Sequence, residues 1–328
     1  MSRKFLLPIA LLFSANIAAS AGCADLVRAY PDFLKGCSGN TLIWRDGTRM
    51  PYDDGRRKSF EQALNHPDLE DMFRYPYPRG ARGYNVTPAK NFDPGRIRYE
   101  PLFRKMYGDS ASQVRRHLTS INWFGQRIRV TSVNGVARQL QAVERDLERE
   151  VRRNPKLKKY LTPIGGTFKW RRIAGTKRLS VHSFGAAMDI NVKYSAYWRW
   201  NKGPYRYRNQ IPLAIVKAFE RHGFIWGGKW YHYDTMHFEY RPELLHARGS
   251  RGGTKSAALP VPSRSGARHP ASRPPSSGSH GTHTVAPGET LWSIARRYHT
   301  SVDALRRANG LPGNDLKAGQ TLKIPATR

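Results

Sequence analysis

The chain has 328 residues, and 39% of them are hydrophobic, so it can bury a sizeable core and is not disordered throughout. Its 56 Lys and Arg against 24 Asp and Glu give a formal net charge of +32. This charge predicts attraction to a polyanion such as nucleic acid, an anionic membrane surface or a cell wall. No apolar run approaches the ~20 residues of a membrane-spanning helix, so we expect no transmembrane span in the mature protein.

The first 21 residues have the pattern of a secretory signal peptide. A short basic start precedes an apolar stretch at 5–15, and residues 19–21 (Ala-Ser-Ala) form the small-x-small pattern of a cleavage site. We therefore expect a periplasmic or secreted, wall-associated protein of a bacterium. Export disfavours nucleic acid as a partner, because chromosomal DNA is absent from that compartment.

The sequence has two cysteines, Cys23 and Cys37, just beyond the predicted cleavage site. An even pair in an exported chain predicts one disulfide. The alternative is lipidation of Cys23, since residues 20–23 partly resemble a lipobox. That motif lacks its aliphatic residue at Ser20, and lipidation would leave Cys37 unpaired.

Residues 22–125 alternate short apolar runs with turn signals rich in Asp, Gly and Pro. We expect an accessory region packed on a catalytic domain. Asp53 and Asp54 could form a metal or acid pair, but adjacent carboxylates in a Gly-bounded turn favour solvated turn formers.

Residues 126–246 read as a compact α+β domain with a small antiparallel sheet and flanking helices. Apolar residues recur at helical spacing over 135–152, and a second helix is expected over 211–222, between Pro212 and Gly223. Short strand-like runs surround these helices at 167–173, 187–192, 224–226 and 237–240.

Two polar motifs in this domain carry the expected chemistry. His182 and Asp189 lie in the first motif and Asp234 and His237 in the second. Two imidazoles and one carboxylate would leave the fourth position of a tetrahedral Zn²⁺ open for water. Asp234, three residues before His237, could accept the proton of that water. The same ligand set could hold non-haem iron, but the usual His-x-Asp spacing is missing and export disfavours Fe(II).

The S-x-H-x-x-G-x-A-x-D string at 180–189, followed by D-x-x-H-F-E at 234–239, resembles the LAS-type zinc peptidases. This family includes D-alanyl-D-alanine carboxypeptidases and L-alanyl-D-glutamate peptidases. The resemblance implies that His182, Asp189 and His237 bind zinc and that Asp234 is the general base.

The family also uses an upstream arginine to stabilise the oxyanion, usually in a Tyr-Arg-Ser triplet that this chain lacks. Arg171, after Trp170, is the residue we assign to this role. Glu239 remains the rival base or an orienting group for His237, and His232 remains the rival ligand.

Residues 247–280 contain mainly Ser, Gly, Pro, Arg and Ala, which predicts a flexible linker. The final segment, 281–328, reads as strand, helix, helix, strand. Over 283–325 it resembles a LysM module, a βααβ unit that binds N-acetylglucosamine glycans. The resemblance places the glycan groove at Gly288, Glu289, Thr290 and Leu291, and near Asn309.

Together these features predict an exported zinc metallopeptidase that hydrolyses peptidoglycan stem peptides and is anchored by a glycan-binding module. We expect a monomer. A non-catalytic peptidoglycan-binding protein is the alternative. Carboxypeptidase action on D-Ala-D-Ala and endopeptidase action on L-Ala-D-Glu or a cross-link remain open, because both use the same zinc chemistry.

Overall fold

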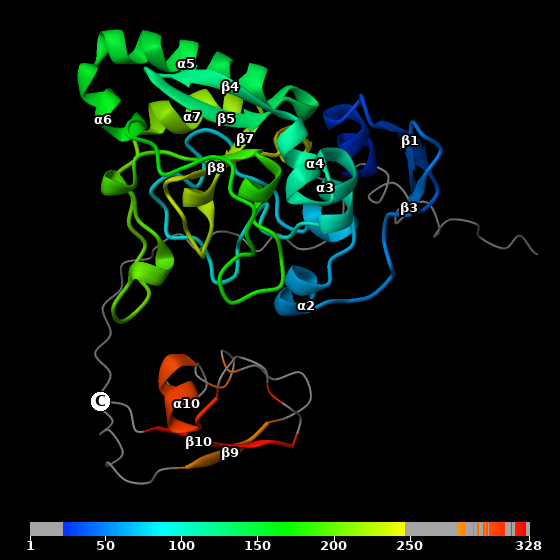
Figure 1. Cartoon of the computed structure of the whole chain (residues 1–328), viewed down its shortest axis with the longest axis vertical. Helices are drawn as coiled ribbons and strands as arrows, with labels where there is room; N and C mark the ends of the chain where they lie inside the picture. The colour runs from blue at the N-terminus through cyan, green and yellow to red at the C-terminus, as the bar shows by residue number, and fades with distance from the viewer. Residues whose placement is uncertain are drawn as a thin grey trace, which may run out of the picture. The chain divides into compact units, whose positions relative to one another are not determined.

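A computed structural model describes residues 22–246 and parts of the C-terminal region, namely residues 281–285, 291, 294, 298, 300, 302–311, 316 and 319–325. Internal contacts divide the chain into two compact units, one within Met1–Lys255 and one within Ser256–Arg328 (Figure 1). The predicted signal peptide at 1–21 and the predicted linker at 247–280 lie outside the described residues. In the described part of the chain, no helix is long and apolar enough to cross a membrane.

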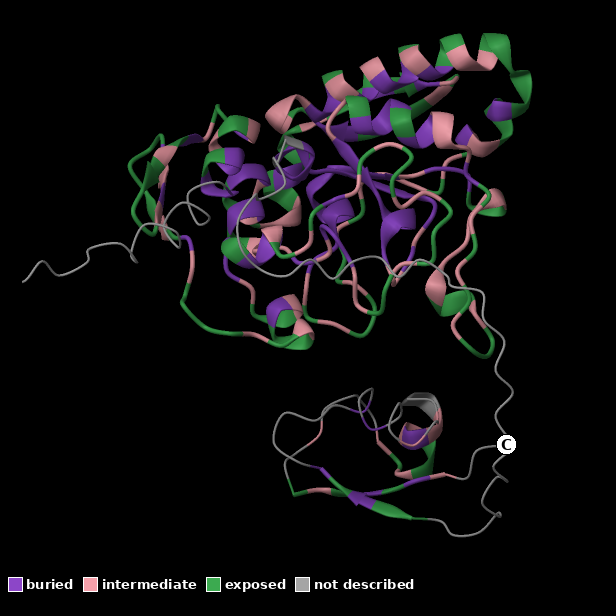
Figure 2. Cartoon of the chain, turned by 180° about the vertical axis from the view of Figure 1, so that it is seen from behind, coloured by how far each residue is buried: buried purple, intermediate pink, exposed green. Residues whose placement is uncertain are grey.

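A small antiparallel sheet lies in the core of the larger unit, with its three strands in the order β6-β8-β7. β6 (Ala187–Asp189) and β7 (Phe224–Trp226) pair with opposite edges of β8 (His237–Tyr240). Nearly every residue of these strands is buried, and the strands are coloured purple in Figure 2. The register places Asp189 opposite His237, so two polar side chains meet at one end of the sheet.

Two helices pack beside this sheet. α7 (Leu213–Arg221) contacts β7, and α5 (Val136–Arg153) contacts α7. α5 buries an apolar stripe at helical spacing and exposes charged residues on its other side (Figure 2). The buried residues of that stripe are Val136, Leu140, Val143 and Leu147.

A β-hairpin, β4 (Leu118–Trp123) and β5 (Gln126–Thr131), lies under α5 (Figure 1). Its two-residue loop has positive φ angles, 49° at Phe124 and 88° at Gly125. Two consecutive positive φ values are the requirement of a type I′ turn, whose twist matches that of the paired strands.

The hairpin also supports the segment that joins β6 to the preceding turn. The Thr131 N–H donates to the carbonyl of Gly185 over 3.0 Å, and a Cβ at Gly185 would come within 2.7 Å of Leu118. Gly185 has a φ of 66°. Only glycine permits both this backbone conformation and the close approach.

The region before the hairpin contains its own sheet, β1 (Leu34–Ser38), β2 (Thr41–Trp44) and β3 (Arg49–Pro51), in antiparallel order β1-β2-β3. Residues 22–29 are helical, and a disulfide joins Cys23 in this helix to Cys37 in β1. Buried residues of this region share one hydrophobic cluster with those of the central sheet and α5.

The remaining helices of the larger unit are short, and several are single 3-10 turns. They are α2 (Phe60–Asn65), η1 (Glu70–Phe73), α3 (Glu100–Tyr107), α4 (Ala111–Arg116), η2 (Val133–Gly135), η3 (Pro155–Leu157), α6 (Lys158–Leu161), η4 (Val181–Phe184), η5 (Val192–Tyr194), η6 (Trp198–Trp200), η7 (Gly227–Lys229) and α8 (Pro242–His246).

In the smaller unit, β9 (Thr282–Thr284) pairs antiparallel with β10 (Thr321–Lys323), and α10 (Val302–Ala308) lies between them in the sequence. Residues 291 and 294 are helical. A separate core is formed by Val285, Leu291, Ile294, Leu305, Leu322 and Ile324.

The α+β prediction is confirmed, and so are the two helices and the strands at 224–226 and 237–240. The strand expected at 167–173 is wrong, since that segment forms only an isolated bridge between Arg172 and Leu179. Ser183 explains the difference, because its hydroxyl accepts from the Arg171 N–H at 2.9 Å and so replaces a strand partner. The strand expected at 187–192 ends at Asp189.

Candidate metal centre

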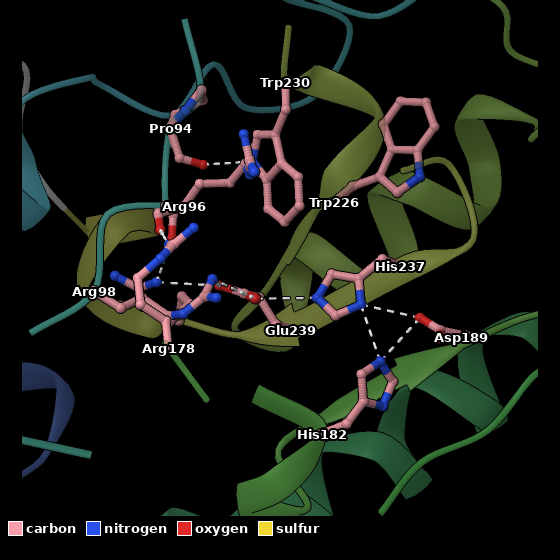
Figure 3. Close-up of polar contacts among 12 residues, drawn as sticks. Pro94, Arg96, Arg98, Arg178, His182, Asp189, Trp226, Trp230, His237 and Glu239 are labelled. Carbon is pink, nitrogen blue, oxygen red and sulfur yellow. Dashed lines mark hydrogen bonds and ion pairs between the residues drawn. The ribbon is translucent and has the colours of Figure 1, made fainter. Parts of the chain in front are cut away.

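Three predicted ligands converge at the end of the central sheet where β6 meets β8. His182 lies in η4, Asp189 ends β6 and His237 begins β8. The Nε2 atom of His182 is 3.1 Å from Asp189 Oδ1 and 3.2 Å from His237 Nδ1. His237 Nδ1 is 2.9 Å from the same Asp189 oxygen. Figure 3 shows these atoms pointing toward one another.

The outer nitrogen of each imidazole contacts an acceptor. His182 Nδ1 is 2.5 Å from the carbonyl of Thr167, and His237 Nε2 is 3.0 Å from Glu239 Oε2. Carbonyl and carboxylate oxygens only accept, so both outer nitrogens donate. In neutral imidazoles the inner nitrogens, His182 Nε2 and His237 Nδ1, then carry lone pairs.

In that state three acceptor atoms face one another, and either a proton on His237 or a metal cation would relieve their repulsion. Burial lowers the pKa of His237, but hydrogen bonds to Asp189 and Glu239 outweigh it and raise the pKa to about 10. These carboxylates thus strongly favour positive charge at this point. Two imidazole nitrogens and one carboxylate oxygen, all within 4.8 Å of one another, are a donor set suited to zinc or iron.

Asp234 lies in the turn before β8, and its carbonyl accepts from the His237 N–H at 3.2 Å. Its Oδ1 atom is buried without a hydrogen-bond partner among the described residues. Burial and the nearby Asp189 carboxylate raise the pKa of Asp234 to about 7. A buried carboxylate with a near-neutral pKa can take up and release a proton, as a general base requires.

Glu239 contacts His237 on the side away from His182 and Asp189 (Figure 3). Its carboxylate also accepts from Arg98 at 3.2 Å and from Arg241 at 3.1 Å. Burial raises the pKa of Glu239, but Arg98 and His237 outweigh it and lower the pKa to about 2. The ionised, fully engaged carboxylate orients the His237 ring, which favours the orienting role over the rival base.

The buried ion pairs continue from Glu239 into the N-terminal region. Arg241 donates to Glu243 and, over 2.6 Å, to the carbonyl of Gly95. The hydroxyl of Tyr30 donates to Glu243 at 2.6 Å. Tyr30, Glu243, Arg241, Glu239 and His237 thus form one chain of contacts, which we call the buried relay.

Replacing Glu239 by glutamine tests the orienting role. We expect Glu239→Gln to weaken metal affinity by about 10–100-fold, because the neutral amide no longer raises the basicity of His237. The measurement is a competition titration with a metal chelator.

The matched control is Glu220→Gln, since Glu220 is a buried carboxylate paired with Lys229 at 2.6 Å in a different part of the core. It should leave the metal affinity unchanged. Equal losses of metal affinity in both variants would show a general effect of removing a buried charge rather than a role of Glu239 in orienting His237.

The other residues predicted from sequence lie outside the three-ligand cluster. Arg171 is exposed, and its guanidinium makes no hydrogen bond or ion pair with any described residue. Burial raises the pKa of the Tyr197 hydroxyl, and the charge of Arg171 offsets part of that rise. His232 pairs instead with Asp93 at 2.6 Å. Trp230 packs against His237 with ring centroids 5.7 Å apart.

Acidic residues also gather in the N-terminal region, and a lysine already pairs with three of them. Lys58 Nζ lies 2.9 Å from Asp54, 2.8 Å from Asp68 and 2.6 Å from Asp71. The side chains of Asp53 and Asp54 accept from backbone N–H groups two residues ahead. The prediction that these two residues are turn formers is confirmed.

Sequence reasoning missed Thr167 and Arg98. Thr167 acts through its carbonyl, which no side-chain pattern reveals, and Arg98 is one of 56 basic residues. Arg241 could have been found, because it continues the alternation of His237 and Glu239 along one face of β8.

In the smaller unit, Gly288, Glu289 and Thr290 lie outside the described residues. Leu291 is 1% exposed and belongs to the core. The amide of Asn309 donates to the carbonyls of Leu305 and Lys323 and accepts from the Lys323 N–H. Its side chain therefore ties the end of α10 to β10.

Family comparisons match one segment in each of the two units of the chain. Residues 174–240 match the family model of D-alanyl-D-alanine carboxypeptidases, and residues 283–325 match the LysM domain. The first match contains the three clustered ligands and Asp234, so the resemblance inferred from the motifs is confirmed.

Curated relatives share short regions with this chain. The Staphylococcus aureus protein SsaALP, named as an autolysin, is 46% identical over 61 residues, or 19% of this chain. An autolysin of Enterococcus faecalis is 40% identical over 42 residues, and the Bacillus subtilis protein YdhD, named as a sporulation-specific glycosylase, is 51% identical over 43, each 13% of this chain. The matches span 23%, 6% and 10% of these relatives, respectively.

Proposed function

We propose that this chain is an exported zinc peptidase that hydrolyses amide bonds in peptidoglycan stem peptides. The observation that carries the proposal is the convergence of two lone-pair imidazole nitrogens and one carboxylate oxygen inside the segment that matches the carboxypeptidase family. The LysM match and the names of the relatives support the cell wall as the site of action.

The chain's own residues supply the proton transfers of this reaction. A zinc ion held by His182, Asp189 and His237 would polarise the scissile carbonyl and lower the pKa of a water molecule. Asp234 would accept the proton of the attacking water and deliver it to the leaving amine. Its orphaned Oδ1 and near-neutral pKa suit both steps. Arg171 stays our proposal for stabilising the oxyanion.

Digestion of purified peptidoglycan tests the proposal and identifies the bond. Mass spectrometry of the products would show loss of one terminal D-Ala from a carboxypeptidase, or cleavage at L-Ala-D-Glu or a cross-link from an endopeptidase. The control is the same protein after metal removal by a chelator, with activity restored by added Zn²⁺. Wall binding without any cleavage would favour the non-catalytic alternative.

The disulfide between Cys23 and Cys37 supports export, because disulfides persist in oxidising compartments. The net charge of +32 supports a partner rich in anionic groups, as bacterial cell walls are. We propose a periplasmic or wall-associated monomer whose partners are the stem peptide and the N-acetylglucosamine glycan.

Removing residues from 250 onward should separate tethering from catalysis. We expect the truncated protein to cleave small soluble muropeptides at the full-length rate and to bind whole walls more weakly, because the LysM unit raises the local substrate concentration. Each unit has its own core, which supports independent folding.

A sedimentation assay with insoluble peptidoglycan at low and high salt measures this effect. High salt screens the attraction of the basic surface for wall anions and leaves the glycan contact. Equal pelleting of both proteins at high salt would remove the tethering role of residues 283–325.

A further inference from the structure

A cavity of about 600 Å³ lies in the larger unit, and its lining residue Tyr197 forms a backbone bridge to Asp234. Its walls come from the segments 195–201 and 206–210, together with Asn85 and Tyr233. The volume falls within the range of small-molecule binding sites. None of the three clustered ligands lines it, so it is distinct from the metal centre.

Flat aromatic rings and hydrogen-bonding side chains line this cavity together. Trp200 is 54% exposed, the largest exposed fraction among the large apolar side chains that the structure describes. Its ring meets Tyr197 edge to face, with centroids 5.8 Å apart. Arg206, Arg208 and Gln210 also line the cavity, and their side chains make no hydrogen bond or ion pair with the described residues.

The cavity wall is held in place by hydrogen bonds to the core. Tyr233 is fully buried, and its hydroxyl donates to the carbonyl of Arg206 at 2.6 Å. Tyr207 donates to the carbonyl of Gly228 at 2.9 Å. Asn209 bonds Asn85 at 2.7 Å. The wall is thus largely preformed, which lowers the entropic cost of binding.

One wall of the cavity is hydrogen-bonded to the turn that contains Asp234, the proposed general base. Tyr197 forms a backbone bridge to Asp234, and the Thr235 N–H donates to the carbonyl of Ala196 at 2.9 Å. Through these two contacts, the cavity wall is joined to the turn that immediately precedes His237.

The lining favours a sugar over an ion. The structure places no carboxylate in it, which disfavours a cation, and its two arginines are exposed rather than fixed for an anion. Sugar hydroxyl and acetamido groups need both donors and acceptors, which amide side chains such as Gln210 supply. The apolar C–H face of a pyranose fits a flat ring such as Trp200.

We propose that this cavity binds an N-acetylated sugar of the glycan strand whose stem peptide occupies the metal centre. The proposal rests on the proposed function, since it assigns the neighbouring part of the same polymer to the cavity. It gives the peptidase unit a sugar contact of its own, in addition to the LysM unit.

The test compares Trp200→Ala with wild type in the full-length protein, on a free stem peptide and on the same peptide linked to its disaccharide. We expect KM for the linked substrate to rise about tenfold with kcat unchanged, and both constants for the free peptide to stay at wild-type values. The matched control is Val192→Ala, an exposed apolar residue outside the cavity lining. It should match wild type on both substrates.

A binding experiment keeps the proposal separate from the proposed function. Calorimetry with N-acetylglucosamine oligomers should show two classes of site in the wild type and one in Trp200→Ala, whether or not any peptide is cleaved. Equal stoichiometry in both proteins would overturn the proposal. An equal rise in KM for the free and the linked peptide would also overturn the proposal, by showing that the cavity holds peptide.

Discussion

Replacing His237 by alanine is expected to abolish metal binding and to reduce peptide hydrolysis to background. His237 is one of the three proposed ligands, and its Nδ1 lies within 3.2 Å of an atom of each of the other two. With two ligands left, the centre no longer has the three-ligand set of a catalytic zinc site. Elemental analysis of the purified protein measures the metal, and digestion of peptidoglycan measures the activity.

His232→Ala is the matched control for this variant. His232 is likewise a largely buried imidazole paired with a carboxylate, Asp93, but it lies outside the cluster. It should keep about one metal ion per chain. Loss of metal from His232→Ala with retention in His237→Ala would reverse the assignment of ligands.

Replacing Asp234 by asparagine is expected to keep the metal and lower kcat by about 10²–10⁴-fold. The amide has nearly the same shape but cannot accept the proton of the attacking water. The three clustered ligands are untouched, so metal content should match wild type. Single-turnover rates with saturating Zn²⁺ measure the chemical step.

Glu239→Gln is the comparison for Asp234→Asn when zinc is saturating. Because Glu239 acts through His237, its variant should recover most of its rate once the metal is bound. A near-normal rate in Asp234→Asn together with a lost rate in Glu239→Gln would make Glu239 the base.

The pH dependence of peptide hydrolysis should also identify Asp234 as the general base. Asp234 acts as a base only when ionised, and burial and Asp189 raise its pKa to about 7. Activity should therefore fall as the pH drops through that pKa. A bound dication lowers the pKa, so the acid limb should have its midpoint at or below about 7. The residual activity of Asp234→Asn should lack this limb.

The sequence predicted the central part of the site because its signals are local. His182 and Asp189 belong to one motif with Gly185 between them, and the structure shows that this glycine allows the hairpin to approach. The strand at 237–240 follows from its short strand-like run, and alternate residues of a strand, such as His237 and Glu239, lie on one face.

The sequence could not predict what supports the site from a distance. Arg98 reaches Glu239 across 141 residues, and Tyr30 reaches Glu243 across 213. Hydrophobic periodicity carries no information about such pairs. The oxyanion group is a similar case. Arg171 was chosen from its place after Trp170 on the strand expected at 167–173, which does not form, and its exposed side chain makes no hydrogen bond or ion pair with the described residues.

The part of the chain that has to fold together is longer than the segment that matches the peptidase family, because the buried relay extends beyond that segment. The family match covers residues 174–240, yet the charges of Glu239 and Arg241 are compensated by Arg98 and by the carbonyl of Gly95. A fragment that began near residue 126, where we predicted the catalytic domain to start, would take Arg98 from Glu239 and the Gly95 carbonyl from Arg241. Removing one partner of a buried charge is costly for a domain with the usual small margin of stability. We therefore expect a folded peptidase unit to need the N-terminal region. Crystallisation trials and inhibitor screens should use a protein that keeps this region intact.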